Sequence, residues 1–479
     1  MHTPTHITDY LAKQAAELPD KPALICSDRT LSFAQLWDEV QQFAGYIAPK
    51  LSRDKQEVVA ILLPNSWQFV VAHLGTLLAG HINMPIDPTY KQLEITGITD
   101  QQRPAHVITH AAVAQEFNPE FPMTLIEDLP WQGSEHIADP LLLPAEEQIA
   151  TLLFTSGTTG KPKITAYSHA NHMWNPAAVS ELWKWTTEDT LLMSTPLSHW
   201  HGLAVILNGG LYHGNTIYVQ ERFEPEATLG MLESGDISLY MHVPIAYYKM
   251  VEHAPEKEYD LSGVRLFVSG SSYLPPAIWH AFKERFGHDI LERYGSSETG
   301  LIASNTLDER IPGSVGYLLP GVDVKVVDGE LAMKSPGRFV GYYGNPEATA
   351  AKITEDGYWM TGDLGDFADN GRLNLRGRVQ EKMKKNGYTV FPRDIEWALM
   401  KDDRISDAFV LGLQDEQALS DRIVYFIVGD ITEEQVQQYC KANLPAAWRP
   451  DIVRFLDAIP KSPAGKPKLA ILRASVADE

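Results

Sequence analysis

Short apolar runs rich in β-branched residues alternate along this chain with amphipathic stretches, and this alternation limits the fold more than any other feature. The expected strands are "EVVAILL" (57–63), "HVITH" (106–110), "TLLMST" (190–195), "VRLFVSG" (264–270) and "DVKVVD" (323–328). The expected helices include "SWQFVVAHLGTLLAG" (66–80) and "PPAIWHAFKERFG" (275–287). Strands that alternate with helices are typical of an α/β protein with parallel strands and crossover helices.

We expect at least two domains, because 479 residues exceed the size at which a single core usually stops growing. Residues 1–378 carry 26 basic and 46 acidic side chains, whereas residues 379–479 carry 14 and 16. The change falls in "LRGRVQEKMKKNGY" (375–388), a polar segment that suits a linker or hinge. These observations predict a large domain over 1–378 and a smaller one over 379–479.

Charge and cysteine content exclude several classes of protein. The formal charge of -22 disfavours binding to nucleic acid or to anionic lipid. The two cysteines, Cys26 and Cys440, lie far apart and indicate neither a disulfide framework nor a zinc site. The N-terminal segment lacks the pattern of a signal peptide, and the most apolar stretch is interrupted by Pro64 and Asn65. A cytoplasmic protein without a membrane span is therefore expected.

The loop "FTSGTTGKPK" (154–163) concentrates glycines, hydroxyls and lysines directly after an apolar run. Glycines let the backbone approach a ligand closely, and amide hydrogens, hydroxyls and lysines favour anionic oxygens, so the loop suits a polyphosphate. It is not a P-loop, because Gly157 and Gly160 are separated by only two residues and Lys161 precedes Pro162. The alternative is a polar surface turn.

Two further stretches offer groups that a nucleotide could use. "ERYGSSETG" (292–300) provides the ring of Tyr294 for stacking on adenine and the carboxylate of Glu298 for Mg²⁺. "GYWMTGDLG" (357–365) places Asp363 between glycines, where it could accept both hydroxyls of a ribose, although a carboxylate there could equally cap a turn.

Two other stretches are less informative by themselves. "PLSHWHGL" (196–203) sets His199, Trp200 and His201 beside a glycine, and ordinary polar or core roles are favoured over metal binding. "PKSPAGKPK" (460–468) is typical of a solvated basic turn.

The order and wording of these stretches resemble the adenylate-forming superfamily, which includes acyl-CoA synthetases, adenylation domains of nonribosomal peptide synthetases and beetle luciferases. The resemblance spans nearly the whole chain and is carried by "LSFAQL", "LLAGHINMPIDP", "TSGTTGKPK", "YGSSETG", "GELAMKSPGRFVGYYGNPEAT", "YWMTGDLG", "LRGR" and the final "GKPK". It implies a large N-terminal domain of parallel sheets packed with helices and a small, mobile α+β lid domain at the C-terminus.

The resemblance also implies roles for individual residues. The family's phosphate loop, which holds the β- and γ-phosphates of ATP, corresponds to Thr155, Ser156, Gly157, Thr158, Thr159, Gly160 and Lys161. The nucleotide site corresponds to Ser271, Glu292, Tyr294, Gly295, Asp363 and Arg378, with Glu298 as the Mg²⁺ ligand. Ser297 stands where the family more often has Thr and would contact the α-phosphate. Glu292 stands where an amide or Asp is usual, and a carboxylate can still accept a hydrogen bond from the adenine amino group.

Further residues correspond to the family's acid and thiol sites. Lys466 would bridge the carboxylate substrate and the α-phosphate, so Lys466, Glu298, Ser297 and Lys161 form the expected catalytic set. The expected acid pocket contains His199, Trp200, Gly270 and Tyr273. Gly387 corresponds to the glycine that lines the pantetheine tunnel, and Gln380 occupies the hinge position, where Asp or Lys is usual.

The implied activity is AMP-forming acid–thiol ligation with ATP, Mg²⁺ and CoA. The acid would attack the α-phosphate to give acyl-AMP and pyrophosphate, and a thiol would then form the thioester after the C-terminal domain rotates. The segment "STPLSHWHG" (194–202) contains no Asp to pair with an amine, which favours an amine-free fatty or aryl acid. Alternatives are loading of a carrier-protein phosphopantetheine and, from another class, a nucleotide-binding regulator without turnover. A monomer or homodimer is expected.

Overall fold

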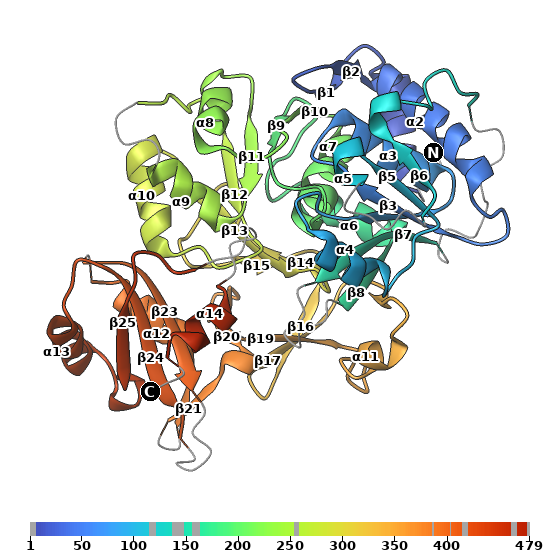
Figure 1. Cartoon of the computed structure of the whole chain (residues 1–479). Coiled ribbons are helices and arrows are strands. Elements are labelled where there is room, and N and C mark those ends of the chain that lie inside the picture. Colours follow the sequence, from blue (N-terminus) through green and yellow to red (C-terminus); the bar gives the residue numbers. More distant parts are fainter. Residues whose placement is uncertain are drawn as a thin grey trace.

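Two large sheets organise the first three quarters of the chain (Figure 1), in a computed structural model that describes residues 6–114, 121–136, 148–155, 163–252, 258–385, 388–402, 404–413, 420–460 and 467–476. The nine-stranded sheet has the order β15-β14-β13-β12-β11-β9-β10-β1-β2. Its strands are β1 (Pro22–Ile25), β2 (Thr30–Ser32), β9 (Thr190–Met193), β10 (Thr216–Val219), β11 (Leu239–His242), β12 (Leu266–Ser269), β13 (Ile290–Ser296), β14 (Gly300–Ser304) and β15 (Tyr317–Leu318).

The second sheet has seven strands in the order β18-β8-β7-β4-β3-β5-β6. They are β3 (Val58–Leu62), β4 (Ile82–Pro85), β5 (His106–Thr109), β6 (Met123–Leu125), β7 (Ile149–Thr155), β8 (Lys163–Ser168) and β18 (Gly341–Tyr342). Both sheets are parallel in the middle, whereas β2, β8, β14, β15 and β18 pair antiparallel at the edges. The predicted strands and helices quoted above are all present, and the α/β class is confirmed.

Fourteen α-helices cover the sheets in the part of the chain that the structure describes. They are α1 (Ile7–Glu17), α2 (Phe33–Ile47), α3 (Trp67–Leu78), α4 (Gln92–Thr99), α5 (Ala111–Ala114), α6 (His169–Val179), α7 (Asn208–His213), α8 (Pro225–Glu233), α9 (Pro244–Glu252), α10 (Pro276–Phe286), α11 (Pro346–Ala350), α12 (Pro392–Leu399), α13 (Glu433–Asn443) and α14 (Leu469–Ala474). Ser32 caps α2, since its hydroxyl accepts from Gln35 N and the Gln35 side chain accepts from Ser32 N.

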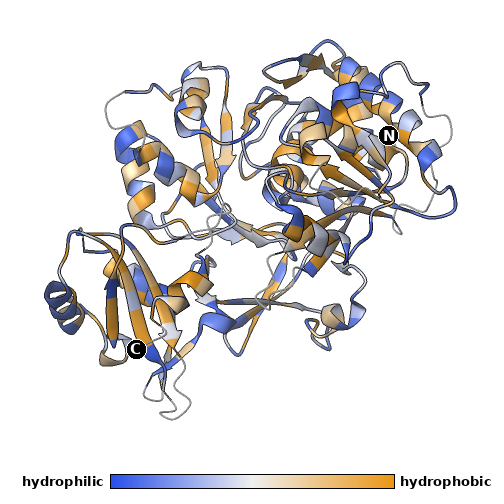
Figure 2. Cartoon of the chain, in the orientation of Figure 1, coloured by the Kyte–Doolittle hydropathy of each residue, from blue (hydrophilic) through white to orange (hydrophobic). Residues whose placement is uncertain are grey.

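Successive side chains of the central strands point to opposite faces of the sheet, and each face packs in a different apolar core. Val59 and Ile61 of β3 face the core that both large sheets share with α1, α2, α3, α6 and α7. Val58, Ala60 and Leu62 face the opposite side of the sheet, in the core that includes α4. Because successive side chains of a strand point to opposite faces, β3 is buried on both sides and is apolar throughout. Figure 2 shows the same apolar strands inside the molecule.

The nine-stranded sheet follows the same rule. Leu239 and Met241 of β11 enter the shared core, whereas Tyr240 packs with Phe267 and Phe282 in the cluster under α8, α9 and α10. Helices thus lie on both faces of each large sheet, and the carboxyl ends of β11, β12 and β13 are left for a ligand, as is usual in open parallel sheets.

A four-stranded antiparallel sheet connects this part to the C-terminal part. Its order is β16-β17-β19-β20, with strands β16 (Asp323–Val327), β17 (Glu330–Lys334), β19 (Trp359–Phe367) and β20 (Leu373–Arg378). A short 3₁₀ turn (Val379–Glu381) follows and contains Gln380, which is exposed. A turn between two sheets suits a hinge, and the boundary at 378/379 stays a prediction.

The C-terminal part contains a hairpin and a small three-stranded sheet. The strands are β21 (Met383–Lys385), β22 (Tyr388–Val390), β23 (Ile405–Leu413), β24 (Arg422–Gly429) and β25 (Ile452–Phe455). One face of the sheet packs on α12 and α13, and the other packs on Leu472 and Val476 at α14. None of the described helices is long and apolar enough to cross a membrane.

Candidate active site

Three predicted nucleotide residues from distant motifs meet at the junction of the two parts. Tyr294 lies on β13, and Asp363 and Arg378 are directly opposite each other on β19 and β20. The Tyr294 hydroxyl donates to Asp363 Oδ2 at 2.7 Å, and Arg378 Nε lies 3.2 Å from Asp363 Oδ1. The charge of Asp363 raises the pKa of the Arg378 guanidinium. The carboxylate of Asp363 is therefore oriented by an aromatic hydroxyl and a cation.

The carboxylate of Glu298 occupies a second polar site next to the strand that follows the predicted phosphate loop. Tyr342 donates to Glu298 Oε1 at 3.2 Å, and Ser296 Oγ donates to Oε2 at 3.3 Å. Tyr342 lies on β18, which pairs with β8, and Lys163 Nζ of β8 lies 4.6 Å from the Tyr342 ring centroid. Burial, and then the charge of Glu298, raise the pKa of Tyr342, which stays a hydrogen-bond donor at neutral pH.

The donor set around Glu298 suits magnesium only if a phosphate completes it. Among the residues that the structure describes, no group of three or more His, Cys, Asp or Glu side chains could hold a metal ion. Mg²⁺ usually binds through one or two carboxylates together with phosphate oxygens and water. One carboxylate together with phosphate oxygens of a bound nucleotide would meet that requirement.

Several predicted residues lie outside the described ranges, so the structure does not test them: Ser156, Gly157, Thr158, Thr159, Gly160, Lys161, Gly387 and Lys466. The backbone of Thr155 ends β7, opposite Lys163 of β8 in the antiparallel pair. Both ends of the predicted phosphate loop are therefore adjacent, on the sheet edge that also pairs with Tyr342.

Glu292 is a buried acid within β13. Its Oε1 accepts a hydrogen bond from Gly313 N at 2.6 Å. Burial raises the pKa of Glu292 from 4.5 to about 8, so the side chain is mostly protonated at neutral pH. A protonated carboxyl keeps a carbonyl oxygen that can accept from an amino group, and its hydroxyl can donate to a ring nitrogen.

Gly295 lies near the end of β13, and Ser297 begins the tight turn that follows the strand. The carbonyl oxygen of Ser297 accepts from the Tyr167 hydroxyl at 2.5 Å, which fixes the backbone of the turn. At Gly295 a Cβ atom would lie 2.2 Å from the carbonyl oxygen of Gly300, so a side chain would break the β13–β14 hairpin.

The predicted acid-pocket residues follow β9 and β12 along the chain, His199 and Trp200 after β9 and Gly270 and Tyr273 after β12. The Trp200 ring stacks on Tyr167 with 4.5 Å between centroids, and 6% of Trp200 is exposed. Ser271 has a φ of 70°, a strained conformation for a residue with a side chain and one that is common at functional sites. The Tyr273 ring lies under the Arg393 guanidinium of α12, 4.7 Å from its centroid.

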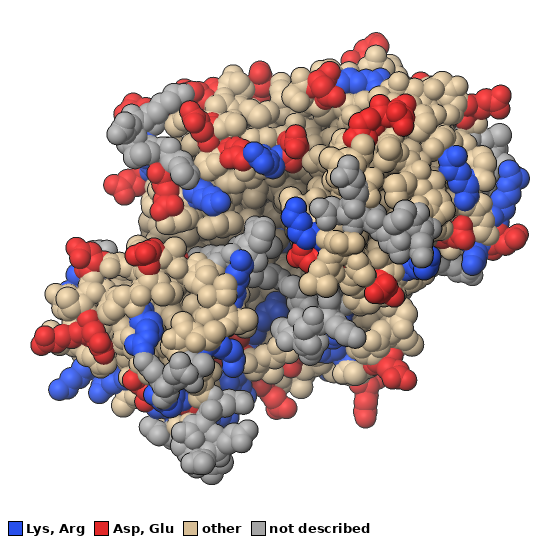
Figure 3. Space-filling view, viewed as in Figure 1, with Lys and Arg blue, Asp and Glu red and all other residues tan. Residues whose placement is uncertain are grey.

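Sequence analysis did not assign a role to Tyr342, Arg293 or His201. Tyr342 reaches Glu298 only because β18 pairs with β8, which the sequence does not reveal. Arg293 had a visible signal, because two charged residues stand together in the otherwise buried strand "ILERYGS". Figure 3 shows Lys and Arg side chains along the hollow between the two parts of the molecule, whereas acidic residues are frequent on the outer surface.

Comparison with known proteins finds the same organisation. The family model described as AMP-binding enzyme matches residues 11–343, and that of the AMP-binding enzyme C-terminal domain matches residues 394–466. A "3-[(3aS,4S,7aS)-7a-methyl-1,5-dioxo-octahydro-1H-inden-4-yl]propanoyl:CoA ligase" of Rhodococcus jostii is 26% identical, over 98% of this chain and 98% of its own length. The 4-coumarate–CoA ligase of Pinus taeda is 28% identical, over 99% of this chain and 95% of its own length.

Solved structures agree. ATP-bound MatB from Rhodopseudomonas palustris superposes with a TM-score of 0.89 at 26% identity, over 99% of both chains. The apo form of the same protein gives a TM-score of 0.83, again over 99% of both chains.

Proposed function

Because the chain belongs to the AMP-binding enzymes, in the acyl-CoA synthetase branch of the adenylate-forming superfamily, we propose how its own residues perform AMP-forming ligation of an acid to CoA. ATP-dependent activation of a carboxylic acid, followed by thioester formation with CoA, is the general activity of such acid–thiol ligases. We assign roles to individual residues, propose the class of acid, and propose the order in which the two domain arrangements occur.

The first half-reaction brings two anions together. An oxygen of the acid carboxylate attacks the α-phosphorus of ATP, the bond to the bridging oxygen breaks, and pyrophosphate leaves. We assign the ribose hydroxyls to Asp363, because Tyr294 and Arg378 hold both of its oxygens in place. Glu292, Ser271 and Gly295 border the adenine and α-phosphate region in this assignment, and Ser297 contacts the α-phosphate.

Charge on the reacting phosphates must be neutralised during attack. The loop from Thr155 to Lys161 is assigned to the β- and γ-phosphates, and Lys466 to the carboxylate and the α-phosphate. Glu298, held by Tyr342 and Ser296, would bind Mg²⁺ together with the phosphates, and the ion would supply further neutralisation there.

In the second half-reaction the CoA thiolate attacks the acyl carbonyl, and AMP leaves. Gly387 is assigned to the pantetheine tunnel and Gln380 to the hinge about which the C-terminal part rotates. We infer that the arrangement described here serves adenylation, and the higher TM-score to the ATP-bound form of MatB supports that inference.

The acid is proposed to be an amine-free fatty or aryl acid. No Asp occurs in residues 194–202 to pair with an amine, and His199, Trp200, Gly270 and Tyr273 are assigned to the pocket. The coumarate of the Pinus taeda relative is an aryl acid, which supports the aryl alternative.

The observation that carries the proposal is the network of Tyr294, Asp363 and Arg378, and Asp363→Ala tests it. We expect kcat/KM for ATP to fall about 10- to 100-fold in pyrophosphate exchange, because the hydrogen bonds to an ionised group are lost. Thioester formation from preformed acyl-AMP should slow as well, since the ribose is held in both half-reactions. Asp369→Ala, which removes an exposed carboxylate from the loop after β19, is the matched control. Wild-type ATP kinetics in Asp363→Ala would refute the assignment.

A further inference from the structure

Arg293 is a buried cation without an acidic partner. It lies on β13 with 4% of the residue exposed, and its Nη2 makes one long hydrogen bond of 3.5 Å to Ser271 Oγ. Its Nε has no hydrogen-bond partner, and no Asp or Glu within the described ranges forms an ion pair with it. Arg372 is equally buried, yet it contacts Glu309 at 3.3 Å. A buried guanidinium normally has such a partner, so the surroundings of Arg293 are incomplete.

Arg293 lies at a place where a side chain could bind a ligand. His242 and Ser269 are the last residues of the parallel strands β11 and β12, and Ser269 is in register with Glu292 of β13. Arg293 is the next residue of β13, just past the level at which β11 and β12 end. Ligands of open parallel sheets bind at these ends. A Cβ atom at Gly270 would lie 2.3 Å from Arg293 Nε, so the guanidinium fits against the bare backbone of the predicted acid pocket.

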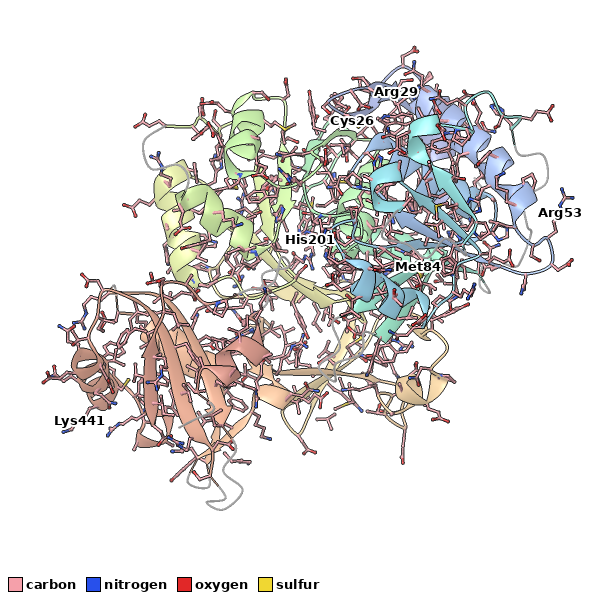
Figure 4. The ribbon with its side chains drawn as sticks, viewed as in Figure 1. Cys26, Arg29, Arg53, Met84, His201 and Lys441 are labelled. Atoms are coloured by element: carbon pink, nitrogen blue, oxygen red, sulfur yellow. The ribbon has the colours of Figure 1, made fainter. Side chains whose placement is uncertain are left out.

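His201 is a second unsatisfied group, within electrostatic reach of this cation. It is 3% exposed, it begins the π-helix His201–Leu207, and neither ring nitrogen has a hydrogen-bond partner in the described part of the chain. Burial, and then the charges of Arg293 and His242, hold the pKa of His201 well below its usual value, so the ring is neutral and can donate one hydrogen bond. Figure 4 shows His201 near the centre of the molecule.

The residues just before Gly270 and His201 also carry polar atoms without hydrogen-bond partners. Ser269 Oγ and Trp200 Nε1 are also buried without partners. Burial lowers the pKa of Arg293 only to about 10, so the side chain remains charged at neutral pH. Water could satisfy the uncharged donors, but only an anion with several acceptor oxygens would also neutralise the guanidinium.

We propose that Arg293 and His201 bind a second carboxylate of the acid, remote from the carboxylate that is adenylated. This deepens the proposed function and rests on it. Ser297, assigned to the α-phosphate, follows Arg293 by four residues, so the two residues are at most about 13 Å apart. The long Arg293 side chain shortens the gap, so the acid is a short diacid whose body is alkyl or aryl.

Matched pairs of acids test this with the wild-type enzyme. Butanedioate, pentanedioate, hexanedioate and a phenyl-bridged diacid are each compared with their monomethyl esters, which keep the length and remove the second charge. We expect kcat/KM in CoA-dependent AMP release to favour at least one diacid over its ester by about 100-fold or more. If every ester equals or exceeds its diacid while acids are turned over, the second carboxylate site is wrong. If no acid of any kind supports pyrophosphate exchange, the proposed function itself fails.

Arg293→Met separates binding from a structural role. The variant should lose the preference for the diacid over its ester and keep turnover of the ester, with a melting temperature equal to or above that of wild type, because an unpaired buried charge is removed. Arg293→Lys should restore part of the preference. The control Arg372→Met should lower the melting temperature and leave the preference intact. A preference that survives in Arg293→Met would overturn the proposal, and the wild-type comparison decides the question if that variant does not fold.

Discussion

Glu292 shows how burial alone changes the chemistry of one side chain. Sequence reasoning predicts an acceptor for the adenine amino group at this position, and the structure adds that the acceptor is mostly protonated at neutral pH because it is 5% exposed. The Gly313 N–H donates to it and partly opposes the shift in its pKa. A protonated carboxyl has the hydrogen-bonding pattern of an amide, the group that usually occupies this position in the family.

The pH dependence of stability tests the state of Glu292. Its pKa lies near 8 in the folded protein and near its ordinary value of 4.5 in the unfolded chain, so only the folded protein keeps the proton between those values. This contribution to stability is fully present below about pH 4.5 and is lost as the pH rises through 8. Glu292→Gln should therefore be more stable than wild type at pH 8, on the order of a few kcal/mol, with a difference that shrinks towards pH 5.

Chemical denaturation at several pH values provides this measurement. The exposed carboxylate of Asp369 gives the control, because Asp369→Asn should show the same small difference from wild type at every pH. A pH-independent difference between Glu292→Gln and wild type would contradict a protonated, buried Glu292.

Helix α12 lies in the C-terminal part and contacts the N-terminal part through its side chains. Arg393 lies over the Tyr273 ring, Trp397 lies against Gly313, and Arg376 Nη1 of β20 approaches Asp394 Oδ1 at 3.5 Å. These contacts come from the C-terminal part and reach the rim of the candidate site. If that part rotates between half-reactions, they exist in only one arrangement.

Arg393→Ala tests whether the contact of α12 with Tyr273 supports adenylation. Loss of a cation–π contact of about 0.5–1.5 kcal/mol should slow pyrophosphate exchange about 2- to 10-fold. Thioester formation from preformed acyl-AMP should keep its rate. Arg404→Ala is the matched control, since the ion pair of Arg404 with Asp402 is local to the C-terminal part. Equal slowing of both half-reactions by Arg393→Ala would show that α12 acts through stability instead.

Local apolar patterns in the sequence predict many of the central strands and helices but not the strands at the edges of the sheets. The strands around residues 58, 107 and 267 and the helices α3 and α10 were predicted because their apolar periodicity is strong. The two-residue strand β18 has no such pattern, and its pairing with β8 depends on tertiary contacts. Tyr342 therefore could not be assigned to Glu298 from the sequence, whereas Asp363 could be selected from its motif.

The unusual surroundings of Arg293 could not be predicted from the sequence. Its position beside Glu292 was visible, but a charged residue in a strand normally faces solvent or an ion-pair partner. Only the three-dimensional surroundings reveal that it is buried against Gly270 without an acid among the described residues. Sequence motifs therefore suffice to propose nucleotide residues, whereas the proposal for Arg293 requires the structure.

In the proposed mechanism, one active site works in two arrangements of the C-terminal part. The N-terminal part would hold the nucleotide through Asp363, while the C-terminal part would present Lys466 for adenylation and Gly387 for thioester formation. The turn at Val379–Glu381 connects β20 to the first hairpin of the C-terminal part, and its Gln380 is exposed. A rotation there would exchange the two groups without moving the nucleotide.

Separate assays of the two half-reactions in Lys466→Ala and Gly387→Leu test this account most directly. Lys466→Ala should lose pyrophosphate exchange by on the order of 10²- to 10³-fold, because its charge acts while two anions are brought together, and should convert preformed acyl-AMP and CoA at nearly the wild-type rate. Gly387→Leu should do the opposite, since its side chain would block the thiol without reaching the phosphates. Equal loss of both half-reactions in both folded variants would contradict a single site served by a rotating C-terminal part.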